Sequence, residues 1–167
     1  PCMIWPAPLR ASPRRRPDRS AMAKTRTPPI YTTPQDAAMA FYQAFEAKDI
    51  DAMMGAWADD EEIVCVHPGG TRLVGYDAVR AGWEQLFAGD PSLSFRLQDL
   101  VVVESVGMAM QSVIEQVALR SDGSTRGYAV ATNVFMRTPV GWRLLLHHAS
   151  PVPASASEPA APEGPLH

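Results

Sequence analysis

The residue best suited to chemistry in this sequence is His67, which ends an apolar segment and precedes Pro68-Gly69-Gly70. Ile63–His67 is predicted to be a strand, and the Pro-Gly-Gly sequence predicts where that strand stops. A side chain at this position is expected to leave the packed layer. Histidine titrates near neutral pH, so it can act as a general acid or base without a large change in pKa. The alternative is that His67 only caps the strand and bonds a backbone carbonyl group.

Other polar side chains could assist a histidine of this kind. Asn133 lies in a predicted strand, and its amide could donate a hydrogen bond to a carbonyl oxygen without carrying charge. A buried amide that is satisfied by its neighbours is the alternative for Asn133. Tyr42 and Tyr128 could each supply a phenol. We therefore predict His67 and Asn133 as catalytic residues, with the two tyrosines as ligand contacts.

His147 and His148 are adjacent in a predicted strand, so their side chains point to opposite faces of the sheet. They cannot chelate one metal ion together in regular strand geometry. One should face the pocket and the other a partner subunit or solvent. Either order is open, and His148 is included among the candidate ligand contacts. The sequence contains no Gly-rich phosphate loop, nucleophile elbow or Cys-x-x-Cys motif, and we expect neither a metal ion nor a cofactor.

The elements that would position these residues begin with helices. Thr33-Pro34 is a typical helix start, and apolar residues at helical spacing follow it as far as Phe45. Asp49 can cap a second helix that carries Trp57 near its end. A third helix is expected after Gly75, with Trp83 on its apolar side. Trp57, Trp83 and Asn133 are expected to surround His67 and to form the apolar walls of a small-molecule site.

The second half of the chain is predicted to form four antiparallel strands joined by short Gly- or Pro-bearing turns. Several of them are apolar on both faces, which favours cover on the outer face by a second copy of the chain. Such runs are Val101–Val103, Val113-Ile114 and Leu144–Leu146. The predicted strands are Leu93–Glu104, Met108–Arg120, Arg126–Arg137 and Trp142–Ala149.

Charge and proline content predict the domain boundaries. Residues 1–26 carry seven basic residues and one acid, whereas the remainder carries eight basic and 17 acidic residues. An acidic body disfavours nucleic-acid binding, and no apolar run approaches the ~20 residues of a membrane span. We predict a basic, proline-rich, disordered extension at 1–31, one domain at 32–150 and a disordered tail at 151–167. Met22-Ala-Lys-Thr further suggests a natural start at residue 22. We expect a cytoplasmic protein.

The order of these elements resembles the nuclear transport factor 2-like superfamily, with the SnoaL-like and ketosteroid isomerase-like proteins in it. The resemblance runs from about residue 38 to 150. It rests on Phe41-x3-Phe45-x3-Asp49, Trp57-Ala-Asp-Asp, His67-Pro-Gly-Gly, Gly75-x2-Ala-Val-x3-Trp83 and Trp142-Arg-Leu-Leu-Leu-His-His. It implies an α+β fold in which a cone-shaped, curved antiparallel sheet wraps around three N-terminal helices. It also implies a pocket at the open end of the cone and a homodimer through the outer sheet face.

The resemblance to ketosteroid isomerase also implies where reactive groups would lie. His67 occupies the position of the aspartate base, Phe41 that of the tyrosine, and Asn133 that of the second acid. All three groups differ, so steroid isomerisation itself is not expected. The prediction is a pocket for a small apolar molecule with one polar group, in a cofactor-free isomerase, cyclase or hydrolase that uses His67. The alternative is a non-catalytic association domain whose task is dimerisation.

Overall fold

The structure is a computed structural model, and it describes residues 29–89 and 92–153. The predicted N-terminal extension and C-terminal tail lie almost wholly outside these residues. The element order is three helices and two short strands followed by four long strands, as expected for an α+β domain. No helix within the described ranges has both the length and the hydropathy to span a membrane.

The helices begin where the sequence predicts. Helix α1 (Pro34–Ala47) starts with a capping box, in which the Thr33 hydroxyl accepts a hydrogen bond from the Asp36 N–H and the Asp36 carboxylate accepts one from the Thr33 N–H. Lys48 ends the helix in the left-handed conformation, at φ 54°. Asp49 then caps α2 (Ile50–Ala56) by accepting from two N–H groups of its first turn. Helix α3 spans Tyr76–Gly89.

The strands form one six-stranded sheet in the order β2-β1-β6-β5-β4-β3. The long strands are β3 (Leu93–Glu104), β4 (Met108–Leu119), β5 (Thr125–Thr138) and β6 (Gly141–Val152), and each pairs antiparallel with the next. Strand β1 (Val64–Val66) runs parallel to β6, so the sheet is mixed rather than wholly antiparallel. Strand β2 (Arg72–Val74), which the sequence did not suggest, pairs antiparallel with β1 at the edge.

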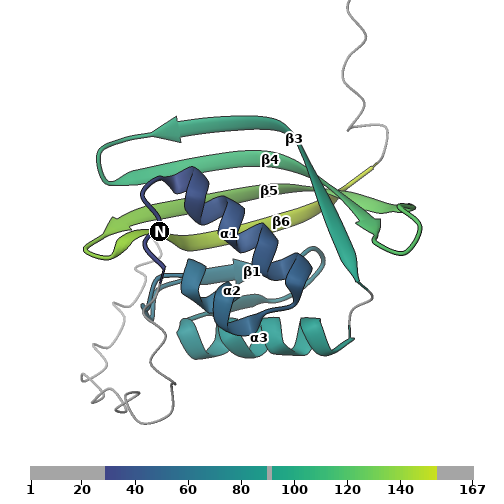
Figure 1. The fold of residues 1–167 in the computed structure, drawn as a ribbon, viewed down its shortest axis with the longest axis horizontal. Coiled ribbons are helices and arrows are strands. Elements are labelled where there is room, and N and C mark those ends of the chain that lie inside the picture. The colour runs from purple at the N-terminus through teal and green to yellow at the C-terminus, as the bar shows by residue number, and fades with distance from the viewer. Residues whose placement is uncertain (1–28, 90–91, 154–167) are drawn as a thin grey trace, which may run out of the picture.

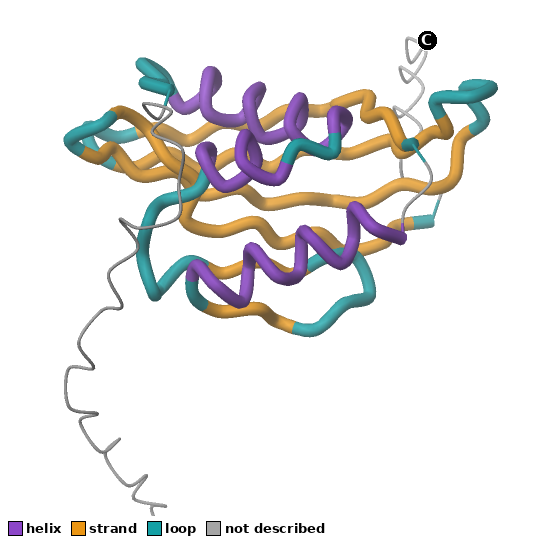
Figure 2. Tube along the Cα trace, turned by 60° about the horizontal axis from the view of Figure 1, so that its bottom comes forward, coloured by secondary structure: helices purple, strands orange, loops and turns teal. Residues whose placement is uncertain are grey.

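All three helices cover one face of the curved sheet, and in Figure 1 they lie in front of it. The tube in Figure 2 shows the same layering, with no helix on the outer face. The core between the layers contains the large buried side chains Phe41, Trp57, Trp83, Phe135 and Leu144. The predicted fold, a cone of sheet around three helices, is confirmed.

The outer face of the sheet is apolar, but the runs that were expected to form it contribute only alternate residues. Val101 and Val103 point outward and are more than half exposed. Val113 and Leu144, by contrast, point toward the helices and are buried. The prediction was wrong for these two residues, because successive side chains of a strand alternate between faces.

Candidate functional site

A chain of hydrogen bonds crosses the buried interior of the cone. The Tyr42 hydroxyl donates to Glu115 Oε1 at 2.7 Å, and it accepts from Asn133 Nδ2 at 3.1 Å. Asn133 Oδ1 lies 2.8 Å from His147 Nδ1. Glu115, Asn133 and His147 are each at most 4% exposed, and Tyr42 is 8% exposed. We call these four residues the polar chain.

Strand register explains how residues so far apart in sequence meet. Asn133 pairs directly with His147 on β6 and with Gln111 on β4, so all three side chains lie in one row on the helix-facing side. Glu115 stands four residues beyond Gln111 on the same strand and therefore on the same face. Helix α1 lies over this face, and its Tyr42 side chain extends to Glu115 on β4 and to Asn133 on β5. A shift of one residue in either pairing would turn a polar side chain to the outer face.

The donors in the polar chain all point toward Glu115. The Asn133 amide donates through Nδ2 to Tyr42, which leaves its oxygen to face His147. An amide oxygen can only accept, so His147 must carry its proton on Nδ1 and leave Nε2 as an acceptor. The assignment follows from the hydrogen-bond pattern. The arrangement is suited to a negative charge on Glu115 and a neutral ring at His147.

Burial sets the charge states at the two ends of the polar chain. It raises the pKa of Glu115 from 4.5 to about 7, and the hydrogen bond from Tyr42 offsets only part of this rise. Burial and then the charge of Glu115 raise the pKa of Tyr42, so the phenol keeps its proton. Burial, with smaller contributions from His67 and His148, lowers the pKa of His147 from 6.5 to about 3. His147 is therefore neutral at neutral pH, whereas Glu115 is close to half protonated.

The two shifts act on stability with opposite signs. Between pH 4.5 and about 7 the folded chain holds the Glu115 proton more tightly than the unfolded chain, so this group's contribution falls as the pH rises. Between about pH 3 and 6.5 the unfolded chain takes up the His147 proton more readily, so that contribution rises with pH. The two effects oppose each other where these windows overlap.

Aromatic rings surround the His147 end of the polar chain. The centroid of the Phe41 ring lies 5.0 Å from those of Tyr42 and His147, and 5.5 Å from that of Trp83. Phe41 also contacts Trp57 edge-on at 6.3 Å. The indole N–H groups of Trp57 and Trp83 are buried without a hydrogen-bond partner in the described part of the chain. This packing keeps water from His147 and explains its low pKa.

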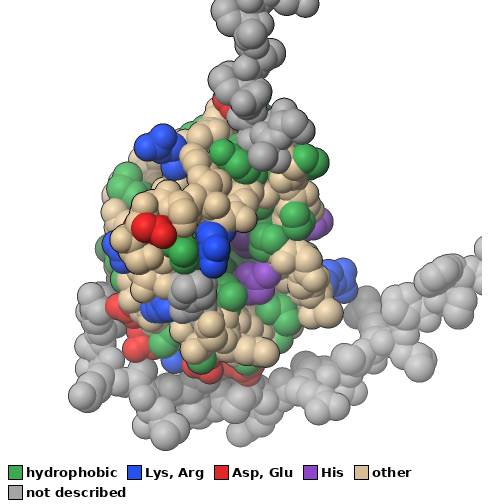
Figure 3. All heavy atoms as spheres, turned by 90° about the vertical axis from the view of Figure 1, so that its right-hand side faces the viewer, with side chains coloured by type: hydrophobic (Ala, Val, Ile, Leu, Met, Phe, Trp, Pro, Cys, Tyr) green, Lys and Arg blue, Asp and Glu red, His purple; other side chains and the backbone are tan. Residues whose placement is uncertain are grey.

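His67 lies beyond this aromatic layer, at the end of β1. Its ring meets the Trp83 ring edge-on with centroids 4.4 Å apart, and its Nε2 lies 3.8 Å from the Cys65 sulfur. The ring is half-buried, and burial lowers the pKa of His67. Burial also raises the pKa of Cys65 to about 12, so the pair does not form a thiolate nucleophile. On the surface drawn in Figure 3, histidine side chains lie among hydrophobic ones.

Helix α3 approaches the sheet closely beside His67. A Cβ atom at Gly82 would clash with the Leu73 side chain and would lie 3.8 Å from His67 Nε2. A larger residue at this position would displace the end of the Leu73 side chain, so glycine allows the closest approach of the helix to β2. Trp83, the next residue of the helix, contacts the His67 ring.

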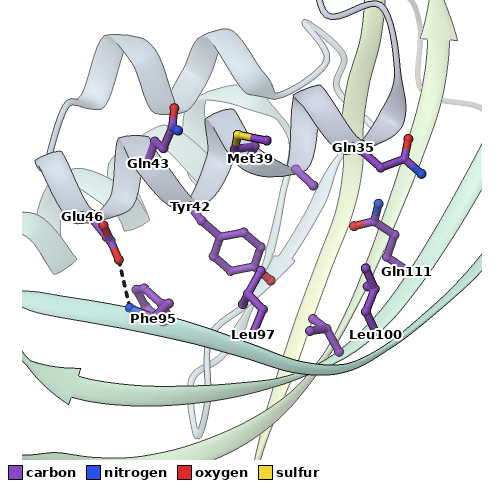
Figure 4. A pocket seen from close by; sticks show the side chains of 11 residues that line it. Gln35, Met39, Tyr42, Gln43, Glu46, Phe95, Leu97, Leu100 and Gln111 are labelled. Carbon is purple, nitrogen blue, oxygen red and sulfur yellow. Dashed lines mark hydrogen bonds between the residues drawn. The ribbon is translucent and has the colours of Figure 1, made fainter.

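A pocket of about 310 Å³ opens between α1 and β3 (Figure 4). One stripe of α1 lines it, formed by Gln35, Ala38, Met39, Tyr42, Gln43 and Glu46. The sheet lines it with Phe95, Leu97, Leu100, Gln111 and Val113. Tyr42 belongs both to this lining and to the polar chain, so the pocket borders the chain at its Glu115 end.

The predicted site residues therefore separate into three places. Tyr42 and Asn133 come together in the polar chain, whereas His67 and Trp83 form a separate contact beyond the aromatic layer. Trp57 is a core residue. Tyr128 pairs with Gln116 and His148 with Thr132, which places both side chains on the outer face, away from Asn133. His147 faces inward and His148 is exposed, so the inclusion of His148 as a pocket contact was wrong.

Three residues of the site were not predicted as such. The sequence did not decide whether His147 or His148 faces the pocket, and it did not mark Glu115 or Gln111 as site residues. Their signal is the alternation Gln111-x-Val113-x-Glu115 in a predicted strand, which places two polar residues on the face of a buried valine. No group of three or more potential metal ligands occurs among the described residues.

The comparisons with known proteins agree with this architecture. A family model described as a SnoaL-like domain matches residues 35–155. A candidate calcium/calmodulin-dependent protein kinase type II association domain from Thiobacillus denitrificans is 39% identical, with 75% of this chain and 99% of that chain covered and a TM-score of 0.68. A candidate dehydratase of the NTF2-like family from Streptomyces avermitilis is 34% identical, with 71% and 93% covered and a TM-score of 0.62.

One curated protein is also similar, over a shorter part of its length. The F-box protein SKIP8 of Arabidopsis thaliana is 26% identical over 110 residues, which are 66% of this chain and 46% of that protein. The chain thus spans about half the length of this relative. The predicted resemblance to the nuclear transport factor 2-like superfamily is confirmed by the family model and by the solved structures.

Proposed function

Because the chain belongs to the family of SnoaL-like domains, we propose that it binds a small, mostly apolar molecule in the pocket between α1 and β3. The observation that carries the proposal is the pocket itself, which has apolar walls and borders the buried polar chain at Tyr42. Its volume of about 310 Å³ is at the lower end of the range of small-molecule sites. Three large apolar side chains of the lining, Met39, Leu97 and Leu100, are 43–57% exposed. A ligand would remove this surface from water.

The proposal predicts that filling the pocket prevents binding. Ala38→Phe places a ring in the pocket and should weaken binding of the neutral fluorescent probe N-phenyl-1-naphthylamine at least tenfold. Ala47→Phe, at an exposed position of the same helix and outside the lining, is the matched control and should bind like the wild type. Fluorescence titration measures both affinities. Absence of probe binding to the wild type, or equal weakening by both variants, would contradict the proposal.

Acid–base catalysis is a second candidate function, with His67 as the general acid or base of a cofactor-free isomerase, cyclase or hydrolase. The low pKa of its half-buried ring favours this role, because a neutral imidazole can accept a proton. The Streptomyces avermitilis relative is a candidate dehydratase, and dehydration also requires proton transfer. His67 is not in the lining of the α1–β3 pocket, so a substrate would reach it by a route outside that pocket. Asn133 would act by positioning Tyr42 and His147, since its amide is already bonded to both.

The catalytic candidate predicts base-catalysed exchange of carbon-bound protons. In D₂O the wild type should accelerate loss of the NMR signals of the α-protons of octan-2-one, and His67→Ala should lower that rate about 100-fold or more. The melting temperature of His67→Ala shows whether the fold is intact. Equal rates for a folded variant and the wild type would remove His67 from the mechanism. A wild-type rate equal to that of buffer would contradict the catalytic candidate as a whole.

We further propose that the chain forms a homodimer through the outer face of the sheet. Strand register places Val101, Val103, Ile114, Val130 and Leu146 on this face, and no described helix covers it. An exposed apolar surface of this extent is typical of an interface between subunits. The Thiobacillus denitrificans relative is described as a candidate association domain, which supports this proposal. Association without a ligand is the alternative function for this chain.

The dimer is expected to depend on the centre of the outer face. Val130 is 36% exposed on the central strand β5, so Val130→Glu should leave the subunit folded but convert the dimer to a monomer in light scattering. Val106→Glu, in the turn between β3 and β4, is the control because Val106 is 89% exposed and outside the sheet. A wild type that is monomeric at micromolar concentration would refute this interface, as would a Val130→Glu dimer.

A further inference from the structure

The α1–β3 pocket is a long groove with a different character at each end. Its helix wall consists of positions 35, 38, 39, 42, 43 and 46, which fall on one side of α1. The opposite side of the helix, with Ala37, Phe41 and Ala44, packs on the core. Gln35 and Glu46 are eleven positions apart on the helix, so this wall is about 16 Å long.

A bulge in β3 shapes the facing wall. The pairing of β3 with β4 shifts between Gln98 and Val101, and Asp99 adopts the left-handed conformation with φ 49°. The strand bends at such a bulge, and the side chains of the unpaired residues change direction. Leu100 is one of them, and its side chain joins Leu97 in the lining. The bulge thus adds an apolar residue to the groove that regular pairing would have placed elsewhere.

Gln111 is the polar feature of this wall. Its side chain is only 3% exposed and lies in the pocket lining, and in Figure 4 it rises from β4 toward Gln35. Its amide makes no hydrogen bond with any residue of 29–89 or 92–153. The described buried side-chain groups without a partner are the Trp57 and Trp83 N–H groups, so the Gln111 amide is accessible from the pocket and can bond to a ligand there. Its carbonyl and NH₂ groups point into the same space and offer one acceptor and one donor side by side.

The charge of the lining excludes anionic head groups. Glu46 is its one charged residue, and no Lys, Arg or His belongs to it. Glu46 lies toward the other end of the α1 wall from Gln35, where its Oε1 accepts a hydrogen bond from the Phe95 N–H at 2.9 Å. Arg120 lies outside the lining and donates to the Glu46 carbonyl oxygen at 3.0 Å, so a carboxylate or phosphate at the Gln111 end would meet no cation of the lining. An ammonium group at that end would bring three donors to a single amide oxygen.

From this geometry we infer that the pocket selects a neutral, elongated apolar molecule whose head group is an amide. The head group pairs with the Gln111 amide through one donated and one accepted hydrogen bond. The chain of the ligand lies along Met39, Leu97 and Leu100 toward Glu46. This inference rests on the proposed binding function and names the class of ligand for the same pocket.

The test compares three probes with the same chain length and different head groups. Octanamide, octanoate and octylamine are used at pH 7.5 to displace N-phenyl-1-naphthylamine from the wild-type protein. Octanamide should compete at a concentration at least tenfold lower than either charged probe. Gln111→Met should weaken octanamide about tenfold more than it weakens N-phenyl-1-naphthylamine, which makes no hydrogen bond to the amide. Gln116→Met, on the outer face of the same strand, is the matched control and should change neither.

The outcomes separate the ligand class from the binding function. Octanoate or octylamine competing as well as octanamide would overturn the amide inference while the binding function stands. An octanamide affinity that is unchanged in folded Gln111→Met would overturn the role of Gln111. If N-phenyl-1-naphthylamine itself does not bind the wild type, the proposed function fails together with the inference. The head-group comparison uses wild-type protein, so it decides the inference even where Gln111→Met does not fold.

Discussion

The cone depends on one constraint, which is that four polar side chains must satisfy one another in a space closed to water. A buried polar group without a partner costs more than a formed hydrogen bond contributes, so the polar chain is stable only when all its members are in place. Tyr42, Asn133 and His147 come from α1, β5 and β6, and they meet only when both strand pairings and the helix position are correct. The polar chain therefore specifies the register of the sheet as well as filling its interior.

The same polar chain connects the two candidate sites. Tyr42 lines the α1–β3 pocket at one end, and the aromatic layer around His147 separates the other end from His67. Because the Glu115 carboxyl group titrates near neutral pH, the charge beside the pocket changes under ordinary conditions. Tyr42 belongs to the pocket wall and its hydroxyl is bonded directly to the Glu115 carboxyl group, so the change in charge occurs one hydrogen bond away from the pocket. The proposed neutral ligand is compatible with both charge states, whereas an anion would be opposed by the ionised one.

Much of this arrangement could be predicted from the sequence, and the rest depends on register. Helix starts at Thr33 and Asp49 are local signals, and the structure places caps at both. Tyr42 and Asn133 are candidates on the grounds of residue type alone, and in the structure they are bonded to each other. The choice between His147 and His148 could not be made, because β6 contains a bulge near Leu145 and the parity of a strand changes across a bulge. Strand β2 is three residues long and has no periodicity to detect, and its pairing with β1 depends on the tertiary structure.

The most direct test of the polar chain is the pH dependence of unfolding in Glu115→Gln. Glutamine keeps an acceptor for the Tyr42 hydroxyl but cannot ionise, so the variant lacks the cost that the wild type meets when the buried carboxyl group loses its proton. Between pH 5 and pH 8 the variant should gain roughly 2 to 3 kcal/mol over the wild type in the free energy of unfolding measured with urea. Glu104→Gln, at an exposed position of β3, is the control, and its free energy of unfolding should stay parallel to that of the wild type over the same pH range. Parallel curves for Glu115→Gln and the wild type would show that Glu115 titrates as in water and would contradict the account.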